Sequence, residues 1–435
     1  MEYAPAIIAV ALVAFAIVSK RLSRSAVTGT MLFTALGLVL GPEVLDVLDF
    51  TGFLGQPELV TLLLTGALVV VLFTDANAIN SSNWRDDILP ARLLGVGLPI
   101  SIVVGWLLAA IVLPSLEFWE AAVLATMLAP TDAALGKAVV SNERVPVRIR
   151  QALNIESGLN DGIALPVFIV FLETALIVEE STPGRDLVGE LLRQVGVAVT
   201  VGVGVGWLGA KAVAWGRSSG RAFAYWLEIG LVALAVTAYA LATPLGGSGF
   251  IAAWVAGFVF GKVLVVADDD PLPEFAEAVG DLLTMASFLV FGVFLGPVLA
   301  DLSWQVILYA VISLALVRMV AVAISLAGAG MRGPTIAYLG WFGPRGLATV
   351  ILTIEIIGES DLQGGTTIAD TALLTVGLSV LLHGATAWWG SNRYADYVRD
   401  HHERDEMSEG HAPPIAIRIP FRARQDPAAE RSTSA

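Results

Sequence analysis

Long apolar stretches recur along the whole sequence and constrain the fold more than any other feature. A helix needs about 20 consecutive apolar residues to cross the roughly 30 Å hydrocarbon layer of a bilayer. Such stretches return from residue 4 to residue 390, and 15% of the 435 residues are charged. A soluble protein carries about 25% charged residues. The chain is therefore expected to be an all-α polytopic membrane protein.

We expect thirteen transmembrane spans. Residues 391–435 are polar and contain prolines and charges of both signs, so they are expected to form a short, partly disordered cytoplasmic tail. The approximate limits of the spans are 4–19, 26–45, 58–78, 91–114, 117–137, 147–178, 187–212, 223–243, 247–265, 276–299, 303–329, 335–358 and 366–390.

Basic residues lie in alternate loops, which predicts the orientation because cytoplasmic loops are enriched in Lys and Arg. An odd number of spans then puts the N-terminus outside and the C-terminus in the cytoplasm. The basic loop residues are Lys20, Arg21, Arg24, Arg85, Arg92, Lys137, Arg144, Arg148, Arg150, Lys211, Arg217, Arg221, Lys262 and Arg332. The intervening loops contain Glu43, Asp46, Asp49, Glu117, Glu120, Glu179, Glu180, Glu359 and Asp361.

The fifth and twelfth spans are each interrupted in the middle. Pro130 interrupts the fifth, "LATMLAPTDAALGK", and the residues Gly-Pro-Arg-Gly at 343–346 interrupt the twelfth. Proline removes a backbone N–H and breaks a helix. Unwound backbone at membrane depth is tolerated only where it lines a cavity or is buried in protein. Paired interruptions in two halves of a chain are typical of inverted-repeat transporters with a binding site near the bilayer midplane.

Five charged residues lie inside predicted spans: Asp75, Asp132, Glu156, Asp161 and Arg345. Each costs at least about 2.5–3.5 kcal/mol at the bilayer centre, so an ionisable residue there is a functional candidate. Four acids against one base cannot all be neutralised by pairing. At least one carboxylate therefore requires a proton or a bound cation.

The segment "NIESGLNDG" at 154–162 contains two of these acids. Ser157 and Asp161 are four residues apart, so they share one face of a helix. That face presents a hydroxyl and a carboxylate, which are hard oxygen ligands suited to a small cation. Glu156 and Asn160 share the neighbouring face, where the Glu can meet Arg345 and the amide can bond to unwound backbone.

The interruption of the fifth span contains a further polar pair. Asp132 stands where a half-helix begins, so it can cap free amides and offset the positive end of the helix dipole. Thr131 can offer its backbone carbonyl from the unwound stretch. Asp132 and Arg345 together are expected to balance the dipole ends of two crossing half-helices.

Three motifs in this order, "APTDAALG", "NIESGLNDG" and "FGPRGLATV", resemble the electroneutral, NhaP-like branch of the monovalent cation:proton antiporter superfamily, the Na⁺/H⁺ antiporters of bacteria and archaea. The resemblance covers residues 1–390. It implies two discontinuous crossing helices (spans 5 and 12), a homodimer and an elevator-like movement. It further implies a transport core of spans 4–6 and 11–13 and a dimerisation scaffold of spans 1–3 and 7–10.

The resemblance also implies roles for the polar residues. Asp161 is the expected cation- and proton-binding carboxylate, and Ser157 and the Thr131 carbonyl are the other expected Na⁺ ligands. Asp75 is expected to contribute through water, although many relatives carry "LFEGG" where this chain has "LFTDANA". The remaining expectations concern support of the site: a structural ion pair of Glu156 with Arg345, and an Asn160 that steadies the unwound chain beside Asp132.

The function expected from these features is exchange of Na⁺, with Li⁺ or K⁺ as further candidates, for H⁺ across the plasma membrane. Competition of one cation and one proton for Asp161 gives electroneutral 1:1 antiport. No cofactor, nucleic-acid partner or enzymatic activity is expected. The alternatives are a K⁺/H⁺ antiporter, an ion channel and, from another class, an intramembrane aspartyl protease with Asp132 and Asp161 as its dyad.

Four further features have predicted structural roles. The glycines in "VGVGVGW" at 201–207 indicate close helix packing, with the dimer interface as a candidate. Lys137 is expected to reach the cytoplasmic interface, Arg318 to be interfacial or packed, and His383 to be a hydrogen-bonded packing residue.

Overall fold

The computed structural model describes residues 4–22, 25, 27–48, 57–78, 88–180, 187–265, 274–358 and 362–400. Every regular element in these ranges is a helix, which confirms the all-α class. The helices, which coincide with the predicted spans, are α1 (Ala4–Leu22), α2 (Gly29–Leu40), α4 (Pro57–Asn77), α5 (Leu89–Arg92), η2 (Leu93–Gly97), α6 (Leu98–Val112), α7 (Phe118–Met127), α8 (Ala133–Val140), α9 (Val147–Glu180), α10 (Leu187–Ser218), α11 (Ala224–Ala242), η3 (Thr243–Leu245), α12 (Gly249–Val265), α13 (Glu274–Ala300), α14 (Trp304–Ile312), η4 (Ser313–Val317), α15 (Arg318–Ser325), α16 (Gly333–Trp341), α17 (Leu347–Gly358) and α18 (Gly365–Asp400).

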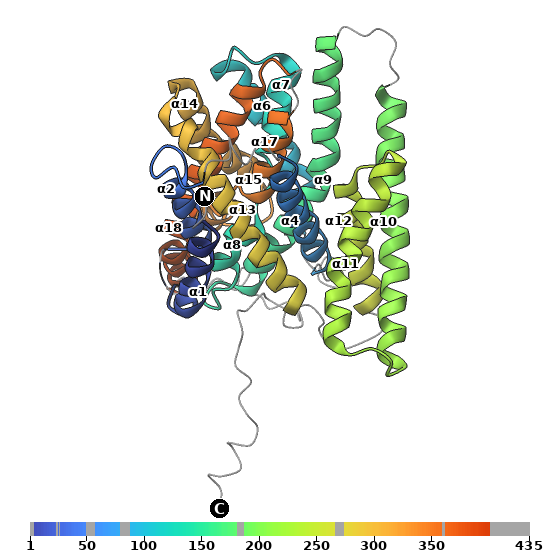
Figure 1. Cartoon of the computed structure of the whole chain (residues 1–435). Coiled ribbons are helices and arrows are strands. Elements are labelled where there is room, and N and C mark those ends of the chain that lie inside the picture. Colours follow the sequence, from blue (N-terminus) through green and yellow to red (C-terminus); the bar gives the residue numbers. More distant parts are fainter. Residues whose placement is uncertain are drawn as a thin grey trace, which may run out of the picture.

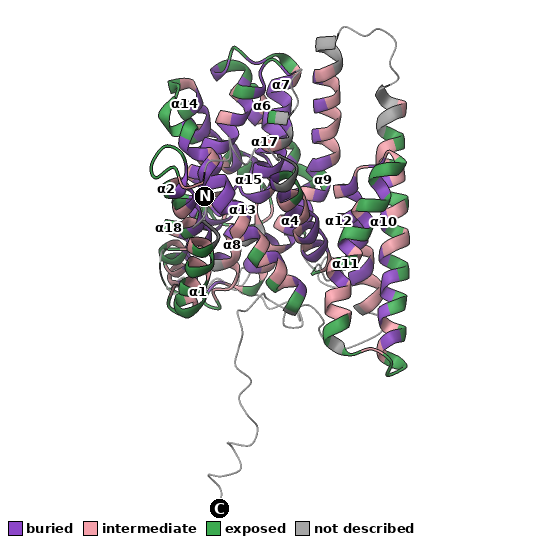
Figure 2. Ribbon diagram, viewed as in Figure 1, coloured by how far each residue is buried: buried purple, intermediate pink, exposed green. Residues whose placement is uncertain are grey.

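Eight of the described helices are long and apolar enough to cross a membrane, and three shorter apolar helices accompany them. In this count α5–η2–α6 and α14–η4–α15 each form one continuous helix. The number of thirteen crossings stays a prediction. Figure 2 shows buried residues gathered in α7, α13, α15 and α17, whereas α10 and α11 expose much of their surface. The exposed side chains include large apolar ones such as Trp207 and Leu208, as expected of a surface that faces lipid.

Both predicted interruptions are present. The fifth span consists of α7 and α8 with an unwound stretch between Met127 and Ala133, and the twelfth consists of α16 and α17 with an unwound stretch between Trp341 and Leu347. In Figure 1, α7 and α17 lie in the upper half of the molecule and α8 lies in the lower half. The two unwound stretches meet, because the Asp132 amide donates to the Pro344 carbonyl at 2.8 Å.

The fourth and eleventh spans share a second irregularity, a single π-helical turn. It occupies Leu93–Gly97 (η2) in one span and Ser313–Val317 (η4) in the other. The two spans pack against each other, α15 on η2 and α6 on η4. A matching feature in both halves of the chain fits an inverted repeat, and π-turns are frequent at functional sites.

The glycine run at 201–207 packs α10 against α12 of the same chain. A Cβ atom added to Gly202 would lie 2.7 Å from the Ala252 carbonyl oxygen, and one added to Gly206 would lie 2.4 Å from that of Ala256. Close packing is therefore confirmed for these two glycines, and its partner is α12. Gly204 points away from this contact, since a Cβ there meets nothing within 4 Å.

The last helix is longer than predicted. It continues past residue 390 to Asp400, where the polar tail was expected to begin. Arg144, which precedes α9, explains the extension because it bonds to Asn392 at 2.8 Å and to Asp396 at 2.5 Å. Tyr394 is buried and hydrogen-bonded to Thr335 of α16. The rest of the predicted tail, 401–435, lies outside the described residues.

Candidate functional site

Asp132 caps two helices at the crossing. One carboxylate oxygen accepts the Leu135 amide at 2.9 Å, which caps α8 as the sequence indicated. The other oxygen accepts the Leu347 amide at 2.7 Å, at the first residue of α17. Two positive dipole ends therefore meet at one negative charge. Gly346 permits this approach, because a Cβ there would lie 2.1 Å from the carboxylate.

Arg345 serves the opposite ends of the same half-helices. It is 1% exposed, and its guanidinium donates to the Gly343 carbonyl at 3.0 Å and the Pro130 carbonyl at 3.3 Å. These carbonyls belong to the unwound stretches that follow α16 and α7. Because a helix C-terminus carries partial negative charge, the cation balances both ends. Its own amide donates to the Ser379 hydroxyl of α18 at 2.7 Å.

The predicted ion pair between Glu156 and Arg345 is wrong. Glu156 pairs instead with Arg318 of α15, through two bonds of 2.7 and 2.9 Å, and both side chains are almost fully buried. Arg318 also donates to the Leu339 carbonyl of α16 at 3.2 Å. A planar guanidinium matches both oxygens of a carboxylate, whereas the Arg345 guanidinium is taken up by backbone carbonyls. The charge count changes as well, since two buried bases, not one, face the four acids.

Thr131, Ser157 and Asn160 form one hydrogen-bonded cluster. The Asn160 amide nitrogen donates to the Thr131 carbonyl at 3.0 Å and lies 2.7 Å from its hydroxyl. The Thr131 and Ser157 hydroxyls are 3.1 Å apart. Asn160 thus holds the unwound chain, as expected, and the cluster gathers hydroxyl and carbonyl oxygens against α9.

Asp161 follows on the Ser157 face of α9, one turn further along the helix. The charges of Asp132 and Asp75 both act on its carboxylate, so the three acids share one region of the molecule. Asp75 lies on α4 near the end of that helix and is half-buried. A carboxylate, two hydroxyls and a carbonyl are therefore brought to the helix crossing, which is a suitable ligand set for a hard monovalent cation.

The sequence matches the family described as "Sodium/hydrogen exchanger, transmembrane" over residues 7–389. The chain belongs to this family.

Curated exchangers of this type resemble it at moderate identity. A K(+)/H(+) antiporter NhaP of Alkalimonas amylolytica is 26% identical over 332 residues, which cover 74% of this chain and 55% of the relative. A K(+)/H(+) antiporter NhaP2 of Shewanella oneidensis is 24% identical, over 85% of this chain and 63% of the relative. A Na(+)/H(+) antiporter 2 of Zygosaccharomyces rouxii is 26% identical, over 79% and 44%. The chain thus spans about half to two thirds of the length of these relatives.

A solved exchanger structure has the same fold. The sodium proton antiporter MjNhaP1 from Methanocaldococcus jannaschii at pH 8 superposes with a TM-score of 0.72, over 91% of this chain and 100% of that chain, at 23% identity. An electron-microscopy structure of the same antiporter gives a TM-score of 0.68 over 92% of this chain and 98% of that chain.

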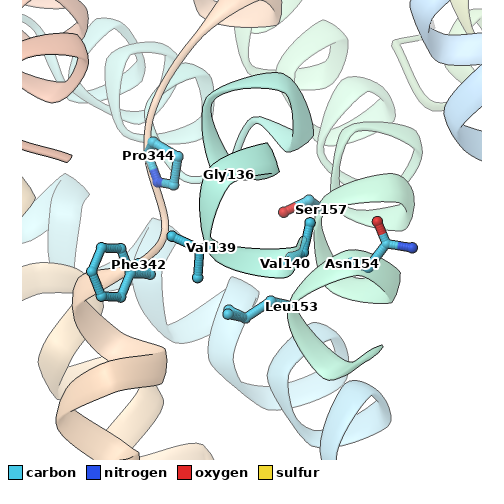
Figure 3. A pocket seen from close by; sticks show the side chains of 8 residues that line it. All are labelled: Gly136, Val139, Val140, Leu153, Asn154, Ser157, Phe342 and Pro344. Atoms are coloured by element: carbon cyan, nitrogen blue, oxygen red, sulfur yellow. The ribbon is translucent and has the colours of Figure 1, made fainter. Parts of the chain in front are cut away.

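A narrow pocket reaches the site of this exchanger-family chain from the α8–α9 side. Figure 3 shows the lining side chains of α8 and α9 facing the unwound stretch of the twelfth span. Ser157 forms part of the wall, so the pocket gives access to the hydroxyl cluster. Its lining residues are Gly136, Val139, Val140, Leu153, Asn154, Ser157, Phe342 and Pro344.

Two supporting residues were not assigned to the site from the sequence. Arg318 was expected to be interfacial or packed; its position deep inside a predicted span was a signal for a buried partner, since a base in the membrane must be paired. Ser379 carries no such signal, because serine is common in membrane helices. His383 is buried and bonded to the Ser379 hydroxyl at 3.0 Å, which confirms it as a hydrogen-bonded packing residue.

Proposed function

We propose that the protein is a secondary antiporter that exchanges Na⁺ for H⁺ with 1:1 electroneutral stoichiometry. One observation carries the proposal: Asn160 ties the unwound Thr131 to the same stretch of α9 that presents Ser157 and Asp161. Membership of the sodium/hydrogen exchanger family supports it. The relatives are named as K(+)/H(+) and Na(+)/H(+) antiporters, which supports cation/proton exchange and leaves the choice of cation open.

In this proposal Na⁺ is bound by the Asp161 carboxylate, the Ser157 hydroxyl and the Thr131 carbonyl. Asp75 contributes through a bridging water. Asp132 and Arg345 hold the crossing, Asn160 holds the unwound chain, and Glu156 acts through Arg318. Na⁺ and H⁺ are the cargo, and no cofactor takes part.

The exchange follows from competition for one carboxylate. Protonated Asp161 has no charge to offer a cation, and a bound cation occupies the oxygens that a proton needs. Asn160 adds a neutral amide beside it, and both carboxylate oxygens of Asp132 accept helix amides. One cation therefore leaves for each proton that binds, and no net charge moves.

We further propose that the chain consists of two parts. The transport core contains spans 4–6 and 11–13, and the scaffold contains spans 1–3 and 7–10. The packing of α7 on α9 and of α17 on α18 supports the first group, and the packing of α13 on α2 and of α12 on α4 and α10 supports the second. The scaffold forms a homodimer in the plasma membrane, with the N-terminus outside and the C-terminus in the cytoplasm. The core moves relative to the scaffold to expose the site alternately.

An intramembrane aspartyl protease fits the geometry less well. Such an enzyme needs two facing carboxylates that share a proton near one water. Here both oxygens of Asp132 accept backbone amides at helix N-termini. Those bonds favour an ionised structural cap over a catalytic acid.

The test is exchange by the purified protein in liposomes. A proton gradient is imposed, a pH-sensitive dye is enclosed, and Na⁺, Li⁺ or K⁺ is added. Addition of the preferred cation is expected to dissipate the gradient in the natural protein and not in Asp161→Asn. Dissipation by K⁺ alone would make the protein a K⁺/H⁺ antiporter. If no alkali cation moves protons between about pH 5 and 9, or if Asp161→Asn remains active, the proposal fails.

A further inference from the structure

An ion pair connects α8 to α13 across the boundary between the two parts of the molecule. The Lys137 ammonium lies 2.7 Å from a carboxylate oxygen of Asp281, and the side chains are 28% and 41% exposed. Lys137 was expected to reach the membrane interface without a partner in the protein. Nothing in its neighbourhood in the sequence points to Asp281, which lies 144 residues away.

The two residues belong to helices that are anchored separately. α8 is capped by Asp132 and packs on α9 and α18, which belong to the proposed transport core. α13 is held to α2 of the scaffold by backbone contact, since a Cβ on Gly292 would lie 2.1 Å from the Thr34 carbonyl oxygen. The ion pair therefore joins one element of each part.

The two prominent ion pairs of the molecule differ in a way that suits different tasks. Glu156 and Arg318 lie inside the core, are 6% and 5% exposed, and share two bonds, so breaking them leaves two buried charges. Lys137 and Asp281 share one printed bond and are both partly in contact with solvent. An exposed pair contributes little net stability and separates at small cost. The second pair is thus suited to repeated opening.

The position of Lys137 relates the pair to access. Its neighbours Gly136, Val139 and Val140 line the pocket that leads to Ser157. The arrangement in which Lys137 reaches Asp281 is therefore the arrangement in which this pocket is open.

We infer that the Lys137–Asp281 ion pair is a releasable tie between transport core and scaffold, which stabilises the state with the α8–α9 pocket open and must separate in every transport cycle. The inference rests on the proposed function, because it requires a core that moves relative to the scaffold.

Cross-linking tests the separation. The chain contains no cysteine, so Lys137→Cys/Asp281→Cys introduces the only two thiols. A bismethanethiosulfonate reagent with a spacer about as long as a lysine side chain joins them. Exchange in liposomes is expected to fall more than about tenfold on cross-linking and to return when a reducing agent removes the cross-link. Cross-linked protein that exchanges at the rate of the reduced protein would overturn the inference. An inactive natural protein would instead overturn the proposed function.

The matched control is a cross-link within the scaffold on the same helix. In Glu43→Cys/Gly296→Cys, the Cβ atoms are about as close as a disulfide requires, since a Cβ on Gly296 would lie 3.6 Å from that of Glu43. This cross-link is expected to leave exchange unchanged. Equal loss in both cross-linked variants would mean that the reagent inhibits unspecifically, and the inference would then lose its support.

Charge exchange tests the bias between states. The labelling rate of a cysteine in Val140→Cys, measured with a hydrophilic maleimide, reports how often the pocket is open. Adding Asp281→Asn is expected to slow labelling about two- to fivefold, the range set by a partly exposed ion pair. The exchanged pair, Lys137→Asp with Asp281→Lys, is expected to restore it. An unchanged rate in the Asp281→Asn background would contradict the inference.

Discussion

Asp132 shows how much one side chain contributes at a helix crossing. Its two oxygens accept the first amides of α8 and α17, which lie far apart in the sequence. The unwound backbone is thus supplied with partners where no water is available to solvate free N–H groups. A side chain with two acceptors and a full charge is needed for this task, and only a carboxylate has both.

Asp132→Asn is expected to destabilise the protein by about 1–3 kcal/mol and to reduce exchange, because the amide lacks one acceptor and the charge. Thermal unfolding in detergent and exchange in liposomes measure the two effects. Ser303→Ala is the matched control, since Ser303 caps only α14, by accepting the Val306 amide at 3.3 Å. It is expected to cost about 1 kcal/mol and to leave exchange intact. Equal behaviour of the two variants would contradict the double-cap role.

The Glu156–Arg318 pair yields a second prediction for single residues. Glu156→Gln and Arg318→Met are each expected to destabilise by about 3–5 kcal/mol, because each leaves an uncompensated buried charge. The double variant is expected to lose much less than the sum, as thermal unfolding of all four proteins will measure. Glu156→Gln with Arg345→Met serves as the comparison, and stronger coupling in this second pair would contradict the assignment. The exposed pair of Arg144 and Asp396 is expected to contribute less than about 1 kcal/mol.

At the scale of helices, small residues determine which faces meet. Gly202 and Gly206 bring the backbones of α10 and α12 together, and Gly292 does so for α13 and α2. In a bilayer such close contact replaces the hydrophobic effect as a source of helix association, because lipid tails are as apolar as the side chains. The scaffold is therefore held by backbone-level packing.

Gly206→Ala is expected to lower the unfolding temperature, since its methyl group would lie 2.4 Å from the Ala256 carbonyl oxygen and force α10 away from α12. Gly204→Ala, two residues away, meets nothing within 4 Å and is expected to be neutral or to stabilise by up to about 1 kcal/mol through helix propensity. Tryptophan fluorescence during heating measures both. A Gly206→Ala protein as stable as Gly204→Ala would show that the contact yields without cost.

At the scale of the whole molecule, the site lies where two discontinuous spans cross and where the proposed core faces the scaffold. Asp161 lies on α9 of the core, and Asp75 lies on α4 of the scaffold. The electrostatic surroundings of the site therefore depend on how the two parts sit relative to each other. Movement of the core changes both access and local charge.

Competition for one carboxylate predicts the pH dependence of transport. The Na⁺ concentration for half-maximal exchange is expected to rise as pH falls, by up to about tenfold per pH unit, because protons and Na⁺ exclude each other by mass action. Initial rates in liposomes at several pH values measure this. Ser157→Ala is expected to raise the half-maximal concentration at every pH while keeping the same pH trend, because it removes a cation ligand and leaves the carboxylate. A half-maximal concentration independent of pH would contradict competition.

The sequence by itself determined the features that depend on neighbours along the chain. The membrane class, the helical segments and the two interruptions follow from apolar length and from Pro and Gly. The shared face of Ser157 and Asp161 follows from helical periodicity. The Asp132 cap on α8 was predicted for the same reason, since a cap bonds within its own turn.

Only the tertiary structure decided which distant residues meet. The partner of Glu156 lies 162 residues away in the sequence, and two buried arginines were available to it. The second helix that Asp132 caps and the face on which the α10 glycines pack were equally open. Such contacts depend on how helices dock, and docking is set by the fit of whole surfaces, which no local pattern records. The sequence therefore predicted which residues form the site, and the three-dimensional packing determined how they are paired.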